Sequence, residues 1–388
     1  MVNVRTIAAS LAASSFIGAV VAHPGDSKEA VNYERAMHKT AQYGAKRAIS
    51  RWAESPATAG LKARSAARRA ATAQALREKR GISEKNIKHK RDQTALEQYL
   101  NVSHDSTETG YTLDTPLDVI FDSNSTSALV PEVTIGPYWV AGELIRVDVT
   151  DAQAGVPLHL DLQFIELNTL EAVPNMLIDI WACNATGVYS GVGNGQGSLN
   201  ATHGRGVQIT DEDGVVQFDT VFPGHYTGRT PHIHVLSTTN ATVLPNNTYL
   251  TDGVANHIGQ LFFDQSLITA VELNEPYVSN TQRLTLNEDD GIDAQQSTAE
   301  YDPFVDYVVL GEDLLADGIL AYLTVFVDLT ANQTAQAHAA AHYYESGGVS
   351  SPGGGFPGGP GGPGGPGGPG RPPPSGFPTS SPTPSATP

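Results

Sequence analysis

The sequence predicts an all-β protein: an antiparallel β-sandwich core, preceded by a basic helical extension and followed by a disordered Gly/Pro-rich tail. Residues 131–335 consist of short apolar or alternating runs separated by Gly, Pro, Asn and Asp, a pattern typical of a sandwich or barrel. The first 92 residues hold 18 Lys and Arg against 7 Asp and Glu, whereas the rest of the chain holds 5 against 34. From Gly347 onward the chain is Gly/Pro-rich and then Ser/Thr/Pro-rich, so this end cannot bury a core.

A secretory signal is predicted at residues 1–22. Arg5 supplies a positive charge, and an apolar run from Ile7 ends in small residues at Val20–Ala22. The run is too short and too interrupted for a membrane-spanning helix, so we expect export. The single cysteine, Cys183, permits no internal disulfide. Seven N-x-[ST] sequons suit a secreted glycoprotein, at Asn101, Asn124, Asn184, Asn200, Asn240, Asn246 and Asn332.

A basic helical extension is predicted at residues 23–105. Its segment "GLKARSAARRAATAQALREKR" is rich in good helix formers but has few large apolar side chains, so we do not expect it to fold alone. Lys79–Arg80 and Lys90–Arg91 are dibasic pairs of the kind that maturation proteases cut. Two hypotheses stay open: a propeptide or electrostatic clamp on the acidic body, and an unprocessed helical extension. Residues 106–130 are predicted to be a linker.

The sandwich is predicted from strand-like runs and turn signals. The expected strands are residues 143–149, 158–167, 177–183, 215–221, 232–237, 258–263 and 319–329. The "DEDG" stretch at 211–214 is expected to form a turn. Residues 336–388 form the predicted tail. Because the body of the chain is strongly acidic, the charge argues against nucleic acid or an anionic membrane as a partner.

The motif His232-Ile233-His234 is the first sign of chemistry. Residues i and i+2 of a strand project from the same face, so the two imidazoles can share a metal such as Fe, Cu, Zn or Ni. The spacing alone also fits a half-exposed strand with one solvated and one hydrogen-bonded histidine.

Two tyrosines and an arginine strengthen the metal interpretation. Tyr226 lies in the Gly-bracketed loop before this strand, and Arg229 lies three residues before His232. An arginine lowers the pKa of a nearby phenol and steadies anionic oxygens. Because an ordinary tyrosine has a pKa of about 10, a trivalent, Lewis-acidic ion is needed to hold it as phenolate at neutral pH, and iron(III) fits best. Tyr189, which follows the strand at 177–183, is the second candidate phenolate, or else an ordinary turn aromatic.

These segments resemble the intradiol ring-cleavage dioxygenases, the catechol and protocatechuate group, and most closely their secreted fungal branch. In that family an "IxIWxxxxxGxY" segment supplies one tyrosine ligand, and "Y…RxxHIH" supplies the other tyrosine, an arginine and both histidines. Here the motifs fall on Trp181, Gly187 and Tyr189, and on Tyr226, Arg229, His232 and His234. The Gly-Pro-Tyr run at 136–138 resembles the entry segment of the family domain, and the resemblance covers residues 131–330.

The resemblance implies a non-haem Fe(III) and an ortho-cleaving dioxygenase. Its metal ligands would be Tyr189, Tyr226, His232 and His234. The substrates would be dioxygen and catechol, hydroxyquinol or a related phenolic, and the products cis,cis-muconate-type diacids. The resemblance also implies that Tyr226 leaves the iron when the diol binds and takes one of its protons. Arg229 would stabilise charge on the ring, and Tyr138, Arg229 and Gln260 would contact substrate; the oligomeric state stays open.

Two other functions stay open. One is a secreted, non-catalytic sandwich that binds aromatics or polysaccharide and keeps a vestigial metal site. The other is an oxidative copper enzyme in which His23, exposed by signal cleavage, binds the metal. Near the motif, His225 is expected beside the ligands or in solvent, His203 and Arg205 at the mouth of the site, and Cys183 as a small buried hydrophobe.

Overall fold

A computed structural model of the chain describes residues 48–82, 128–129, 133–193, 196–291, 303–311 and 313–351. The predicted signal, His23, the Lys90–Arg91 pair, the sequons at Asn101 and Asn124, and the tail beyond residue 351 lie outside the described residues.

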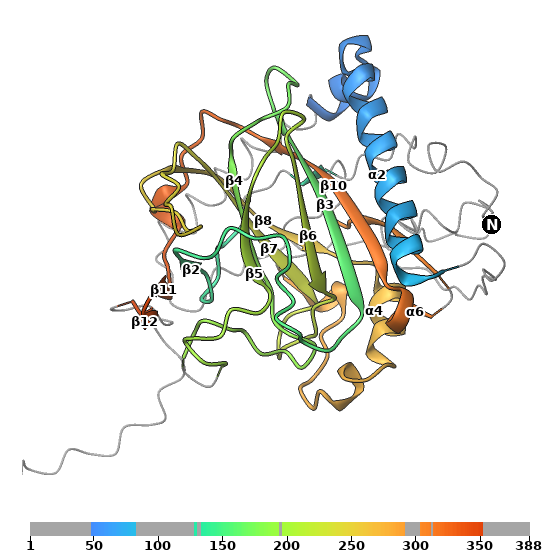
Figure 1. The fold of residues 1–388 in the computed structure, drawn as a ribbon, viewed down its shortest axis with the longest axis vertical. Helices are drawn as coiled ribbons and strands as arrows, with labels where there is room; N and C mark the ends of the chain where they lie inside the picture. The colour runs from blue at the N-terminus through green and yellow to red at the C-terminus, as the bar shows by residue number, and fades with distance from the viewer. Residues whose placement is uncertain are drawn as a thin grey trace, which may run out of the picture.

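Two sheets face each other and make the sandwich (Figure 1). The first contains, in spatial order, β1 (Ala128–Leu129), β10 (Ile319–Val327), β3 (Pro157–Glu166) and β6 (Val215–Val221), with β9 (Asp306–Val309) also paired to β10. The second contains β5 (Arg205–Ile209), β4 (Leu177–Trp181), β7 (His232–Thr239) and β8 (Val254–Phe262). The predicted all-β sandwich is thereby confirmed.

Strand pairing departs from the prediction in one respect. Every pairing in the second sheet is antiparallel, as is that of β3 with β6, but β10 runs parallel to β3 over its whole length and parallel to β1. Such a pairing joins segments far apart in the chain, which local alternation does not reveal.

One predicted strand is wrong. Residues 143–149 make only isolated bridges, Ile145 to Val207 of β5 and Asp148 to Asp219 of β6. The segment crosses from the edge of one sheet to the edge of the other, so neither sheet holds it as a strand. The other predicted strands are found as β3, β4, β6, β7, β8 and β10. The expected turn is present, because Gly214 N–H donates to the Asp211 carbonyl at 2.9 Å.

The main core lies between the two sheets and follows the two-residue period of the strands. On β3, Leu158, Leu160 and Leu162 face inward and are fully buried. Ile233 and Val235 of β7 meet them from the other sheet. The intervening residues of each strand therefore project from the outer faces, and both outer faces are covered by other segments.

A helix covers the outer face of β3 and β10 (Figure 1). After η1 (Pro56–Thr58), α2 (Ala59–Arg80) ends at Gly81, whose φ of 68° lies in the left-handed region. Arg68 and Arg69 of α2 pair with Asp161 of β3 at 2.9 and 3.2 Å. The helical part of the predicted extension therefore packs on the sandwich through ion pairs as well as apolar contacts.

Loops, short helices and a C-terminal hairpin complete the described chain. Shorter helices of the described chain include α4 (Gln265–Glu272), η2 (Tyr277–Ser279), η3 (Asn287–Asp289), α6 (Leu314–Asp317) and η4 (Thr334–Gln336). The predicted tail starts too early, because β11 (Ala341–Tyr344) and β12 (Gly347–Ser350) form a hairpin that pairs with β2 (Val140–Ala141). Backbone pairing fixes these residues, and the aromatic side chains of β11 distinguish them from the Gly/Pro-rich segment that follows.

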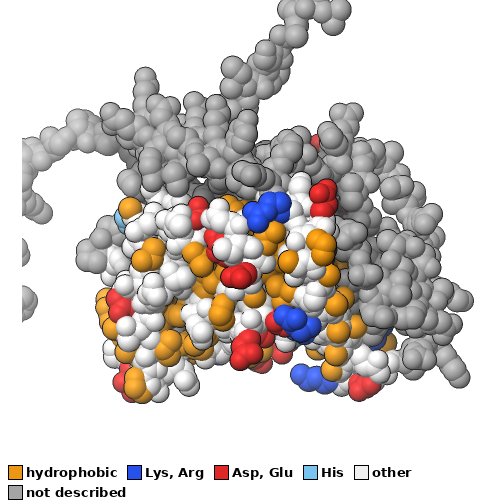
Figure 2. Space-filling view, turned by 90° about the horizontal axis from the view of Figure 1, so that it is seen from above, with side chains coloured by type: hydrophobic (Ala, Val, Ile, Leu, Met, Phe, Trp, Pro, Cys, Tyr) orange, Lys and Arg blue, Asp and Glu red, His pale blue; other side chains and the backbone are white. Residues whose placement is uncertain are grey.

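No helix among the described residues is long and apolar enough to cross a membrane. On the face seen in Figure 2, acidic side chains stand between uncharged and hydrophobic ones, and no basic cluster gathers among the coloured residues.

Candidate metal centre

The two histidines of the motif lie on the outer face of the second sheet. His232 and His234 alternate on β7 with the core residues Ile233 and Val235, and both are buried. Their Nε2 atoms are 3.2 Å apart. Trp181, opposite His234 in the register of β4, stacks on its ring with centroids 4.6 Å apart. The two-residue period of β7 thus brings two imidazole nitrogens close together, and the stacked ring of Trp181 holds the His234 ring in place.

Both imidazoles are neutral. Burial lowers the pKa of His232 to about 3, and the positive charge of Arg229 acts in the same direction. Burial also lowers the pKa of His234 well below its ordinary value. The Nδ1 of His232 lies 2.6 Å from the Thr230 carbonyl oxygen, so Nδ1–H donates there and the lone pair of Nε2 points into the cluster. Ligating histidines are commonly oriented in this way.

The loop before β7 brings Tyr226 beside the histidines. Its hydroxyl lies 3.4 Å from Nε2 of His232, and its ring remains half-buried. Burial raises the pKa of the Tyr226 phenol, and the charge of Arg229 opposes that effect only in part. Without a cation the phenol therefore stays protonated at neutral pH.

The second tyrosine lies deeper. Tyr189 is fully buried, its ring centroid is 5.6 Å from that of Tyr226 and 6.4 Å from that of His234, and burial raises its pKa well above the ordinary value. Among the described residues its hydroxyl has no hydrogen-bond partner. A buried hydroxyl without a partner is unfavourable, which suits an oxygen that serves as a ligand.

Two glycines in the left-handed region let the backbone approach this cluster. A Cβ at Gly187 (φ 77°) would collide with the His225 carbonyl oxygen, so glycine lets the Tyr189 and Tyr226 loops touch. A Cβ at Gly136 (φ 73°) would lie 3.2 Å from Cε1 of His234. Both glycines belong to segments that carry the family resemblance.

Arg229 brings a positive charge to the cluster. Its Nη1 lies 3.5 Å from Nε2 of His232, its Nη2 donates to Gln260 Oε1 at 2.5 Å, and its Nε donates to Asp290 at 2.8 Å. Burial acts to raise the pKa of the Asp290 carboxyl, but the positive charge of Arg229 and the hydrogen bonds from Arg229 and the Thr230 amide hold it below its ordinary range. Gln260 is thus placed against Arg229. Asp290 was not predicted, because an acidic turn residue 61 positions away has no local signal.

Tyr138 forms a wall of the site. Its ring stacks on that of Tyr189 with centroids 4.5 Å apart and meets the ring of Tyr226 edge-on at 6.0 Å. The side chain of Gln196 donates to its hydroxyl at 3.3 Å. The structure therefore brings Tyr138 to the cluster from a loop more than 50 residues away.

The neighbouring residues are only partly where the sequence put them. Arg205 is not at the mouth of the site but buried beneath Tyr189, because it pairs with the buried Glu143 at 3.1 Å. His203 is buried beside the carbonyl of Val188. His225 lies against Glu272 and the carbonyl of Gln282 and does not face the cluster.

Cys183 and Asn184 both take part in the packing of the loop. Cys183 is buried as expected, and burial raises the pKa of its thiol to about 12. The Asn184 amide, which a glycan would occupy, donates to Gln153 at 3.2 Å. The side chain that would carry a glycan at this sequon is therefore already engaged in folding the loop.

The donor set is two imidazoles and two phenols. No group of three or more His, Cys, Asp or Glu side chains that could hold a metal occurs among the described residues. The phenols are therefore essential to any metal site here, and phenolate oxygen with imidazole nitrogen suits a hard, strongly Lewis-acidic ion.

Comparison with known proteins agrees with the motif. Residues 136–298 match the family model described as "Dioxygenase". No curated protein matches the chain.

Solved dioxygenase structures align with about half of the chain. An intradiol ring-cleavage dioxygenase from Tetranychus urticae is 28% identical, with 52% of this chain and 94% of that chain covered and a TM-score of 0.44. The dioxygenase domain of a carbohydrate-binding fusion protein from Streptomyces sp. SirexAA-E is 21% identical, with 52% and 98% covered and a TM-score of 0.33. Catechol 1,2-dioxygenase from Pseudomonas arvilla C-1 is 17% identical, with 54% and 65% covered and a TM-score of 0.34.

The family-model match spans the segment that holds Tyr138, Tyr189, Tyr226, both histidines and Gln260. The match of residues 136–298 to the dioxygenase family model agrees with the resemblance to the intradiol ring-cleavage dioxygenases that the motifs carry.

Proposed function

We propose that the protein is a secreted non-haem Fe(III) dioxygenase that cleaves catechol-type aromatic diols between the two hydroxylated carbons. The observation that carries the proposal is the convergence of Tyr226 with His232 and His234, whose polar atoms lie 3.2 to 3.4 Å apart, beside the buried Tyr189 hydroxyl, which has no hydrogen-bond partner among the described residues. Signal and sequons support secretion, and the products would be muconate-type diacids.

The residues present fit ferric iron. The Nε2 atoms of His232 and His234 lie 3.2 Å apart, both rings are neutral, and the Nδ1–H of His232 donates to the Thr230 carbonyl, so the Nε2 lone pair of His232 is directed to a point that the His234 ring also reaches. Tyr189, Tyr226, His232 and His234 would hold the iron, and only a strongly charged ion overcomes the raised pKa values of the phenols. When bound, ferric iron would draw electron density from a coordinated diol and make its ring reactive to dioxygen.

The protein's own side chains divide the remaining work. Tyr226 is the more exposed of the two tyrosines, so its phenolate oxygen is the one that an entering diol reaches and can protonate. Arg229 places its guanidinium beside the cluster and would stabilise negative charge on the bound substrate. Tyr138 presents its ring edge toward Tyr226 and would border the aromatic ring of catechol or hydroxyquinol.

The test is a metal analysis and a visible spectrum of the secreted full chain, followed by oxygen uptake with catechol and hydroxyquinol. We expect one iron per chain, a tyrosinate-to-iron charge-transfer colour, and stoichiometric consumption of oxygen and diol. An iron-replete but colourless protein would overturn the proposal. Binding of aromatics without oxygen uptake would indicate the non-catalytic sandwich, and copper in place of iron would indicate the oxidative copper enzyme.

A further inference from the structure

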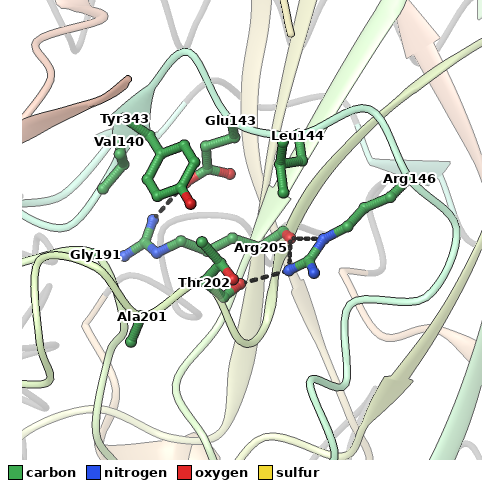
Figure 3. Close-up of a pocket in the computed structure, with 9 residues that line it drawn as sticks. All are labelled: Val140, Glu143, Leu144, Arg146, Gly191, Ala201, Thr202, Arg205 and Tyr343. Carbon is green, nitrogen blue, oxygen red and sulfur yellow. Dashed lines mark hydrogen bonds and ion pairs between the residues drawn. The ribbon is translucent and has the colours of Figure 1, made fainter. Parts of the chain in front are cut away.

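Three ionisable side chains are buried together behind Tyr189. Glu143 follows β2, Asp179 lies on the outer face of β4, and Arg205 begins β5; each is no more than 4% exposed. Arg205 Nη1 donates to Glu143 Oε1 at 3.1 Å, as the dashed line in Figure 3 marks. Two buried carboxyl groups therefore lie near one buried guanidinium, which is bonded to Glu143 and acts on Asp179 through its charge.

Each of the two carboxyl groups has one oxygen that accepts hydrogen bonds and one oxygen that accepts none from the described residues. Asp179 Oδ2 accepts from Trp139 Nε1 at 2.8 Å and from the Tyr249 hydroxyl at 2.9 Å. Its other oxygen, Oδ1, and Glu143 Oε2 accept nothing from any donor group among the described residues. The two carboxyl groups are nevertheless close enough to interact. A proton between these oxygens satisfies both of them.

Charge balance requires the same proton. Two carboxylates and one guanidinium would leave a net negative charge away from water, which is strongly unfavourable. The other groups near the pair do not cancel it. Tyr249 is a neutral phenol, and Arg146 is paired with Asp151 at 2.6 Å. One proton on the pair brings the buried cluster to zero.

The cluster reaches Tyr189 from two sides. Arg205 Nε donates to the carbonyl and the hydroxyl of Ser190, at 2.9 and 3.0 Å, and its guanidinium carbon is 5.9 Å from the Tyr189 ring centroid. Trp139, bound to Asp179, adjoins Tyr138, whose ring stacks on Tyr189. The pair therefore anchors both the backbone after Tyr189 and the ring beside it.

We propose that Glu143 and Asp179 share one buried proton and that this protonated pair, through Arg205 and Trp139, is the positioning element that holds Tyr189 at the candidate metal centre. The importance of Tyr189 as a ligand rests on the proposed function, but the shared proton does not. The pair's proton is kept in the folded chain, whereas an unfolded glutamate releases it above a pKa of about 4.3. Burial and the neighbouring carboxylate raise the pKa of Glu143 well above that value.

The sign of the pH dependence follows from this difference. Between pH 5 and 7 the folded chain binds one proton that the unfolded chain lacks, so stability falls as pH rises. The contribution to the folding equilibrium constant is about tenfold per pH unit. In Glu143→Gln the amide donates to Asp179 and accepts from Arg205 without titrating, so this contribution disappears.

The experiment measures urea unfolding of the metal-free full chain at pH 5, 6 and 7. We expect the ratio of the Glu143→Gln to the wild-type folding constant to rise about tenfold per pH unit. Asp151→Asn, which removes an exposed carboxylate paired with Arg146, is the matched control and should show no such rise. A ratio for Glu143→Gln that does not change with pH would overturn the shared proton.

Positioning is tested separately by hydrogen exchange. We expect Glu143→Leu, which keeps neither bond, to speed amide exchange at residues 187–193 at least tenfold, while Glu143→Gln leaves it at the wild-type rate. Equal exchange in a folded Glu143→Leu would overturn the positioning role. If the leucine variant does not fold, Arg205→Lys, which loses the Nε contact to Ser190, is measured in its place. Faster exchange at residues 187–193 is again expected, and unchanged exchange would overturn the positioning role. None of these measurements requires iron, so they stand whether or not the proposed function does.

Discussion

Two buried polar groups, one on each outer face of the sandwich, differ in how completely they are hydrogen-bonded. Under α2, the carboxylate of Asp161 is fully buried, and both its oxygens accept hydrogen bonds, from Arg68, Arg69 and Gln217. On the face of β4 and β7, the hydroxyl of Tyr189 and Nδ1 of His234 have no hydrogen-bond partner among the described residues. The hydrogen bonds of the Asp161 carboxylate are therefore complete as folded, whereas those of the Tyr189 hydroxyl are completed only when something else binds. Such a difference separates a structural interface from a functional site.

The largest expected effect is at the incomplete face. Tyr189→Phe should abolish the charge-transfer colour and ring cleavage, because a candidate ligand is gone. It should also raise the unfolding free energy of the metal-free protein by about 1–3 kcal/mol, because a buried hydroxyl without a partner is removed. Visible spectra, oxygen uptake and urea unfolding measure the three quantities.

Tyr277→Phe is the matched control for that substitution. Tyr277 is equally buried, but its hydroxyl donates to the Phe222 carbonyl at 2.7 Å and accepts from the Val156 amide at 3.0 Å. The same chemical change should therefore lower the unfolding free energy by about 1–3 kcal/mol. If both variants shift stability in the same direction, the contrast between partnered and unpartnered phenols is wrong.

The complete face should respond to loss of its carboxylate. Asp161→Asn keeps the shape but leaves Arg68 and Arg69 without a counter-charge, so we expect about 3–5 kcal/mol lower stability at pH 7. The pKa of Asp161 is held below its ordinary range, by Arg68 above all and despite burial. Its contribution is therefore present above pH 4 and lost as pH falls, so variant and wild type should converge in acid.

Denaturant unfolding from pH 2 to pH 7 measures this effect, and the stabilities of variant and wild type should begin to converge below pH 4. Arg64, also on α2, makes an exposed ion pair with Asp213. Arg64→Ala is the control and should leave the unfolding free energy unchanged. Equal stability of Asp161→Asn and wild type at pH 7 would show that α2 is held by apolar contacts alone, and that its arginines are dispensable.

The local sequence pattern was sufficient to predict a contact where the two residues belong to the same strand or to the same turn. The alternation of β7 predicted that His232 and His234 share a face, and the short loop predicted that Tyr226 folds back over them. The same periodicity located six strands, because inward residues such as Ile233 and Leu160 must be apolar. Family motifs added Tyr189, which lies about 40 residues from its companions.

The local sequence pattern did not predict contacts between segments that are far apart in the chain. Nothing near Ile319 shows that β10 runs parallel to β3, and nothing near Asp290 shows that it meets Arg229. Arg205 was expected at the mouth of the site, but its pairing with the buried Glu143 places it in the interior. A charge can be buried when its partner is buried too, and the partner is known only from the fold.

The smallest of these effects should distinguish the arginines of the two faces. The guanidiniums of Arg68 and Arg69 serve one carboxylate, whereas Arg229 divides its nitrogens between Asp290, Gln260 and the open side toward His232. Arg229→Lys keeps the positive charge, but a lysine cannot bind Asp290 and Gln260 together. Its ammonium group will therefore lie farther from the cluster than the guanidinium does. We expect iron content to persist and kcat with catechol to fall about 100-fold, the usual loss for one displaced charge-stabilising donor. Oxygen uptake at saturating diol measures it. An unchanged kcat would mean that a point charge suffices and that the fork of contacts serves only to pack the loop.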